Sequence, residues 1–137
     1  LTSRRESQME IVKRADVPCQ PLPGRGVQKV VGKDSLIASG KMSMGFAVYS
    51  GTYGPMEPHH HAEETVYVVA ARDAWVRTGD GKDALGPPLA LAAGTTMHFA
   101  ELEWHQFGFA PDGFLDILFL YGQVDNLRPE EILGRKV

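Results

Sequence analysis

The sequence predicts an all-β domain, and three observations lead to that prediction. Short segments rich in β-branched and aromatic residues recur along the 137 residues, as they do in strands. Glycine and proline turns separate these segments, and helical periodicity is nearly absent. An antiparallel sheet explains all three observations, because short turns of this kind connect neighbouring antiparallel strands.

Ten stretches are strand candidates, and two turns between them have clear chemistry. Residues 78–82 (Thr-Gly-Asp-Gly-Lys) are typical of a hairpin tip, and residues 110–113 (Ala-Pro-Asp-Gly) of a tight reversal. Near the end, Pro129 can begin a short helix that stops at Gly134. The expected strands are 10–13, 27–31, 36–38, 42–50, 65–70, 74–78, 88–91, 96–99, 105–110 and 114–121.

Length and composition indicate a single domain, residues 1–137, with residues 1–8 as a polar leading stretch outside the fold. Fourteen Lys and Arg face seventeen Asp and Glu, for a formal charge of −3 without basic blocks. This balance gives no electrostatic case for nucleic acid or membrane and favours a small neutral or polar partner. The lone cysteine, Cys19, excludes an intramolecular disulfide, and no apolar run reaches membrane-spanning length. We therefore expect a cytoplasmic protein.

Some expected strands are apolar on both faces. Successive strand side chains point to opposite faces, and residues 114–121 place Leu115, Ile117 and Phe119 on one face but Leu118 and Leu120 on the other. A half-exposed strand would alternate with polar residues, so the outer face needs a cover. A second sheet, the N-terminal segment or another subunit could supply it, and a homodimer is the simplest interpretation.

Histidines and acids form the most informative cluster. His59, His60 and His61 come just before Glu64, and His105 follows about forty residues later. If residues 58–61 end a strand, His59 and His61 share a face while His60 points away. Neutral imidazoles and a carboxylate are common ligands of divalent transition metals, so His59, His61, Glu64 and His105 are the predicted metal ligands.

These residues resemble the cupins, a superfamily of small jelly-roll barrels whose two sequence motifs frame a metal. Gly54, His59, His61 and Glu64 follow the order of the first cupin motif, although two of its gaps are each one residue short.

The second motif resembles the stretch from Gly94 to Phe109, which has the same length without a gap and contains His105. Ala100, Leu102 and Phe109 replace the usual proline, glycine and asparagine. The resemblance covers about residues 42–121. It implies a single-domain cupin with a double-stranded β-helix barrel, a short C-terminal helix and a metal near one end.

The register of the histidine triplet has an alternative. Counting back from Glu64 with the usual motif spacing would place His60 and Pro58 at the ligand positions. Strand alternation favours His59 and His61 instead.

Two functions remain open at this stage. The first is a metal-dependent enzyme, with Fe, Mn, Ni or Zn, that acts on a small organic substrate as a dioxygenase, isomerase or decarboxylase. The second is a non-catalytic protein that binds a sugar or another small molecule in the same barrel. No general base apart from the ligands is evident, so catalytic residues stay unassigned.

Overall fold

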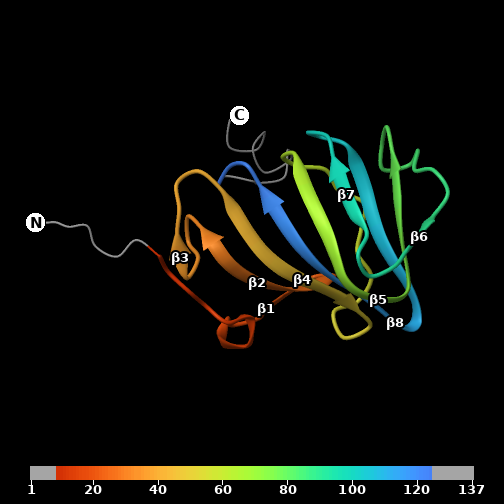
Figure 1. Cartoon of the computed structure of the whole chain (residues 1–137). Helices are drawn as coiled ribbons and strands as arrows, with labels where there is room; N and C mark the ends of the chain where they lie inside the picture. Colours follow the sequence, from red (N-terminus) through yellow and green to blue (C-terminus); the bar gives the residue numbers. More distant parts are fainter. Residues whose placement is uncertain (1–8, 125–137) are drawn as a thin grey trace, which may run out of the picture.

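The computed structural model describes residues 9–124, which form one curled sheet of eight strands (Figure 1). Neighbouring strands follow the order β1-β2-β4-β8-β5-β6, while β3 pairs with β2 and β7 with β5. All pairings are antiparallel except that of β2 with β3. The elements are a 3-10 helix η1 (Arg14–Asp16), β1 (Gln20–Leu22), β2 (Arg25–Gly32), β3 (Ile37–Ala38), β4 (Ser43–Ser50), β5 (Glu64–Gly79), β6 (Leu89–Leu91), β7 (Thr96–Phe99) and β8 (Trp104–Tyr121).

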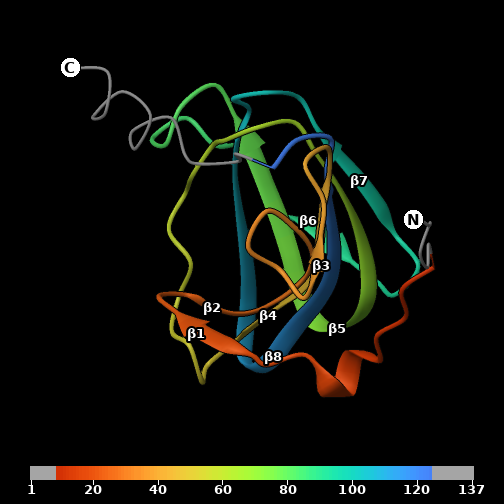
Figure 2. The same cartoon turned by 90° about the vertical axis from the view of Figure 1, so that its left-hand side faces the viewer.

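Seen from the end, the strands wrap around an interior, which confirms the predicted jelly-roll barrel (Figure 2). The expected strand at 10–13 is wrong, since this stretch pairs with no strand and leads into η1. The leading residues 1–8 and the helix expected after Pro129 lie outside the described residues. Among residues 9–124, no helix is long and apolar enough to cross a membrane.

Two long strands, β5 and β8, connect the two halves of the barrel. The last part of β8 pairs with β4 on one side and with the first part of β5 on the other. The first part of β8 pairs with the last part of β5, where Ala74 faces Phe109 and Gly79 faces Trp104. The four separate strands expected for these stretches are therefore two continuous ones.

The tight reversal expected at residues 110–113 is also wrong. Arg72 faces Phe114 while Ala74 faces Phe109, so these four residues bulge out of β8 without changing its direction or its partner. Asp112 adopts a left-handed conformation with φ 67° at this bend. Turn-forming residues here make a bulge, because the strand must bend as the sheet closes.

The core lies between the two halves of the barrel. Val66, Val68, Leu115 and Ile117 are almost completely buried, and Phe107 packs at 5.0 Å between ring centroids from Tyr49. These residues come from inward positions of β4, β5 and β8, as strand alternation predicts. They form a packed base on which the polar side chains of the site rest.

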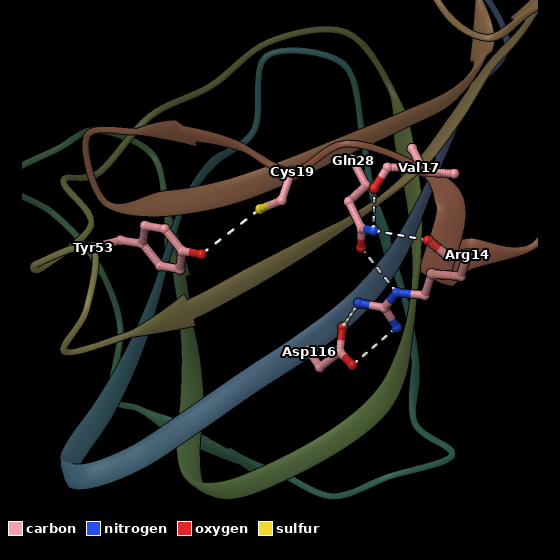
Figure 3. A network of polar contacts seen from close by, with 6 residues as sticks. All are labelled: Arg14, Val17, Cys19, Gln28, Tyr53 and Asp116. Carbon is pink, nitrogen blue, oxygen red and sulfur yellow. Dashed lines mark hydrogen bonds and ion pairs between the residues drawn. The ribbon is translucent and has the colours of Figure 1, made fainter.

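The N-terminal segment covers part of the outer face of the sheet (Figure 3). The guanidinium of Arg14 donates two hydrogen bonds to the carboxylate of Asp116, at 3.0 and 2.7 Å, and one to Gln28. The same guanidinium lies 4.1 Å from the ring centroid of Phe46. Gln28 in turn donates to the backbone carbonyls of Arg14 and Val17. This outer network fastens the segment across β2, β4 and β8.

The rest of that face keeps apolar side chains exposed. Tyr67 and Val69 on β5 and Leu120 on β8 are each about two-fifths exposed, at 45%, 39% and 42%. The N-terminal segment, one of the covers that the sequence allowed, thus shields Phe46. In the described part of the chain it leaves the patch of Tyr67, Val69 and Leu120 uncovered.

Candidate metal centre

A short backbone bridge joins the histidine triplet to the start of β8. The amide of His59 donates to the carbonyl of His105 at 3.0 Å, and the amide of His105 donates back at 2.9 Å. A third bond, from the Leu102 amide to the His61 carbonyl at 2.8 Å, fixes the next turn. Two stretches more than forty residues apart in sequence are therefore held side by side by backbone pairing, independently of any ion.

Three histidine rings converge beside this bridge. His59, His61 and His105 are 7%, 6% and 1% exposed, and one ring nitrogen from each lies within 4.8 Å of the others. The His59 and His105 rings are 4.4 Å apart between centroids and meet edge to face. Such a trio of buried imidazoles can hold a divalent transition metal.

Each of these rings is oriented by the same device. The Nδ1 atoms of His59, His61 and His105 donate to the backbone carbonyls of Glu57, Ala62 and Glu103, at 3.2, 3.0 and 2.9 Å. A carbonyl oxygen can only accept, so Nδ1 carries the proton in each neutral ring and the Nε2 lone pair is available to a metal. Metal-binding histidines commonly use this arrangement, and the donor set therefore fits such an ion.

His60 lies apart from the trio. Its ring stacks on Trp104, with centroids 3.9 Å apart and planes inclined by 18°. The structure thus groups His59 with His61 and turns His60 away, as strand alternation predicted. The alternative register, with His60 and Pro58 at the ligand positions, does not fit this geometry.

Glu64 begins β5 next to the trio. Its Oε1 atom is 3.5 Å from Nε2 of His61 and 3.8 Å from Nε2 of His105. It also accepts a hydrogen bond from the Tyr121 hydroxyl across the β5–β8 pair. The tight trio consists of histidines alone, and the carboxyl is positioned beside it as a fourth donor group.

Burial decides the charge of Glu64. It raises the pKa of this carboxyl to about 8, although the Tyr121 hydrogen bond and the positive charge of Arg25 act in the opposite direction. Burial also raises the pKa of Tyr121 well above its usual range, and the nearby Glu64 adds to that increase. Without a cation the carboxyl keeps its proton at neutral pH, whereas a metal would favour the ionised form.

A cavity of about 560 Å³ opens beside the histidines. Its volume is in the range of small-molecule sites. His59, His61 and Glu64 form part of its wall, and residues of β2, β4 and β8 form much of the rest. The lining includes Leu22, Arg25, Val27, Lys29, Val31, Lys33, Asp34, Ser43, Met44, Ala47, Tyr49, Phe107, Phe119 and Tyr121.

Sequence reasoning missed the basic side of this wall. The Gly24-Arg25-Gly26 stretch reads as a plain loop in sequence, yet Arg25 begins β2 and lines the cavity. The sequence did indicate this wall, because Arg25, Val27 and Lys29 are spaced two residues apart and therefore share one face of a strand. His98, in contrast, is on the surface with hydrogen bonds to Glu63 at 2.6 Å and Thr65 at 2.8 Å, away from the site.

Comparison with solved structures identifies the fold. The polyketide cyclase RemF from Streptomyces resistomycificus superposes with a TM-score of 0.66 at 19% identity, over 89% of this chain and 82% of that one. Fe(II)-HppE with an alternative substrate gives 0.61 at 13% identity, over 82% of this chain and 60% of that one. Lactobacillus farciminis oxalate decarboxylase, as a formate complex, gives 0.64 at 17% identity, over 88% of this chain and 36% of that one.

These three neighbours are cupin-fold proteins, so the chain has a cupin-type fold, as its two motifs predicted. It spans only 60% and 36% of the HppE and oxalate decarboxylase chains. No protein-family model matches the sequence. No curated protein matches it either.

Proposed function

We propose that this protein is a metal-dependent enzyme that acts on a small organic substrate in the barrel. His59, His61, Glu64 and His105 are the proposed ligands of a divalent Fe, Mn, Ni or Zn ion. The observation that carries the proposal is the convergence of three Nδ1-protonated imidazoles, two of which, His59 and His61, line a 560 Å³ cavity. Such a site leaves coordination positions for substrate, as catalytic metal sites do.

The neighbouring structures support this class of chemistry. They include an oxalate decarboxylase and a hydroxypropylphosphonic acid epoxidase, whose Fe(II) form is among them. A dioxygenase, isomerase or decarboxylase reaction is therefore the proposed activity. A bound divalent ion would act as a Lewis acid toward a substrate oxygen or offer a binding position for dioxygen.

The residues of this chain have definable parts in such a reaction. The three backbone-anchored imidazoles hold their rings in place, so they do not need to reorganise when substrate arrives. Glu64 supplies the negative charge that offsets part of the charge of a cation. Val27, Ala47 and Phe119 make part of the cavity wall apolar, which excludes water from the reacting groups.

Elemental analysis of untagged protein tests the metal site, and an oxygen-uptake screen tests the enzyme. We expect close to one transition-metal ion per chain, and iron-dependent turnover with one of three classes: catechols, thiols or small keto acids. Tight capture of a ligand without turnover would replace the enzyme by a non-catalytic binding protein. Metal-free protein that stays inactive after loading with each of the four metals would overturn the proposal.

A homodimer and a cytoplasmic location complete the proposal. The exposed apolar patch of Tyr67, Val69 and Leu120 supports pairing of two copies. The exposed free thiol of Cys19 supports a reducing compartment. Light scattering coupled to gel filtration should give twice the chain mass, and Leu120→Lys should give the mass of one chain. Cell fractionation tests the location.

A further inference from the structure

The cavity wall also has a basic part, which β2 supplies. Arg25, Val27, Lys29 and Val31 alternate along β2 and all line the cavity, and Lys33 follows just after the strand. Strand alternation places the two basic side chains of β2 on the same side of the sheet. The chain as a whole has a formal charge of −3, so this concentration of positive charge is local.

The two basic side chains of β2 have few polar partners in the described part of the chain. Within residues 9–124, Arg25 and Lys29 form no ion pair, and the guanidinium of Arg25 donates one hydrogen bond, from Nη1 to the Pro23 carbonyl at 3.3 Å. A guanidinium has five N–H donors in a planar fork, so most of its capacity is left for a ligand. Arg14 makes an instructive contrast, because its fork is filled by Asp116.

The positive charge of Arg25 also interacts with groups beside the histidines. Its charge acts on both Glu64 and Tyr121, which lie on the histidine side of the cavity. Tyr49 and Ser43 add hydroxyl groups to the same lining. A ligand in this cavity would thus share the lining with both His59 and His61 and the guanidinium of Arg25.

We propose that the substrate is a small organic anion whose acid group is bound by the guanidinium of Arg25, with Lys29 contributing positive charge nearer the surface. This inference rests on the proposed function, since it names the substrate class of that same cavity. Arg25 is the residue that selects the charged group, and a carboxylate fits its fork in a bidentate manner. The expectation of a small neutral or polar partner, drawn from the charge balance of the whole chain, did not consider this local charge.

Binding measurements with matched probes test the inference. Metal-loaded wild-type protein is titrated with acetate, succinate and benzoate, and with acetamide, succinamide and benzamide, by calorimetry at constant ionic strength. We expect at least one carboxylate to bind about 10-fold or more tightly than its amide, because hydrogen bonds to charged groups are worth that much. Arg25→Gln should remove this preference, and Arg25→Lys should restore part of it.

Two controls separate this inference from the proposed function. Lys82→Gln removes the same charge from the exposed β5–β6 loop and should leave the preference intact. Metal content is measured on every variant, and carboxylate binding is compared only between samples that carry the same amount of metal. Full metal content with no Arg25-dependent carboxylate preference would overturn the anion inference only. Loss of metal from wild-type protein with the preference retained would overturn the metal proposal only.

Discussion

Two polar clusters lie on opposite faces of β8. The inner cluster, His59, His61, Glu64 and His105, contacts β8 through Tyr121 and His105 itself. The outer network of Arg14, Gln28 and Asp116 uses an acid from the same strand, but each of its charges has an opposite charge in direct contact.

The two clusters differ in whether their carboxyl group has an oppositely charged partner in direct contact. In the outer network a partly exposed carboxylate has a bidentate guanidinium partner, which is a favourable arrangement. In the inner cluster the carboxyl is buried beside neutral rings, and burial raises its pKa to about 8. Buried acids of this kind cost stability and concentrate at functional sites. The outer network therefore stabilises the fold. The inner cluster has the features of a functional site, because its buried carboxyl has no directly contacting cation in the described part of the chain.

The largest expected effect is the loss of metal from the inner cluster. His105→Ala or His59→Ala should weaken binding about 100-fold or more, because even the partners that orient a ligand are worth 10- to 100-fold. His60→Ala is the matched control, since its ring stacks on Trp104 outside the trio. Metal content by elemental analysis measures the result. Loss of metal from His60→Ala, with His59→Ala harmless, would reverse the assignment.

The next effect concerns the cost of burying Glu64 in metal-free protein. The native state holds the proton up to pH about 8, while the ordinary value is 4.5. The folded form therefore binds more protons than the unfolded one, so this carboxyl destabilises the fold increasingly as pH rises through that window and levels off above it.

Glu64→Gln removes that cost while keeping an acceptor for Tyr121. Relative to wild type, the variant should gain about 2 kcal/mol more at pH 8.5 than at pH 6, since one pKa unit corresponds to about 1.4 kcal/mol. Urea unfolding with a chelator at the two pH values measures it. An equal difference at both pH values would mean that Glu64 does not titrate in this range.

A smaller effect is expected in the outer network. Arg14→Gln should lower the free energy of unfolding by about 1–2 kcal/mol, because it removes a bidentate, partly buried pair and loosens the N-terminal segment. Metal content should be unaffected. A double-mutant cycle with Asp116→Asn isolates the coupling between the two side chains. A coupling near zero would mean that the segment is held by other contacts.

The smallest effect is expected at the surface pair of His98 and Glu63. Their side chains are 55% and 64% exposed, and exposed pairs contribute about 0.5 kcal/mol or less. His98→Ala should therefore leave both stability and metal content close to wild type. A loss of metal in this variant would mean that the metal site includes His98 on β7 and is not confined to the buried histidine cluster.

Local sequence features predicted more of the strands than of the connections between them. Alternation grouped Leu115 and Ile117 on one face of their strand, and the structure shows that this face is the buried one. The turn chemistry of residues 110–113 predicted a reversal, but pairing with β5 on both sides makes it a bulge. Turn propensity is a local property, whereas the partner of the next strand is decided by long-range closure of the sheet.

The grouping of the histidines was predictable for the same reason that the strands were. Alternation within one segment separates His59 and His61 from His60, and the order of motif residues adds Glu64 and His105. Tyr121, which donates to Glu64, and Arg25, which lines the cavity, were not identified as site residues. Both come from strands far along the chain from the triplet, so no local pattern connects them to it.

By itself, the sequence determined the strand periodicity and the separation of His59 and His61 from His60, because these depend on near neighbours along the chain. Only the tertiary structure decided which way β8 continues, what covers each face, and which charges share the cavity. Those outcomes depend on pairings between residues far apart in the sequence, such as Arg14 with Asp116 and His59 with His105, whose partners are selected when the sheet closes.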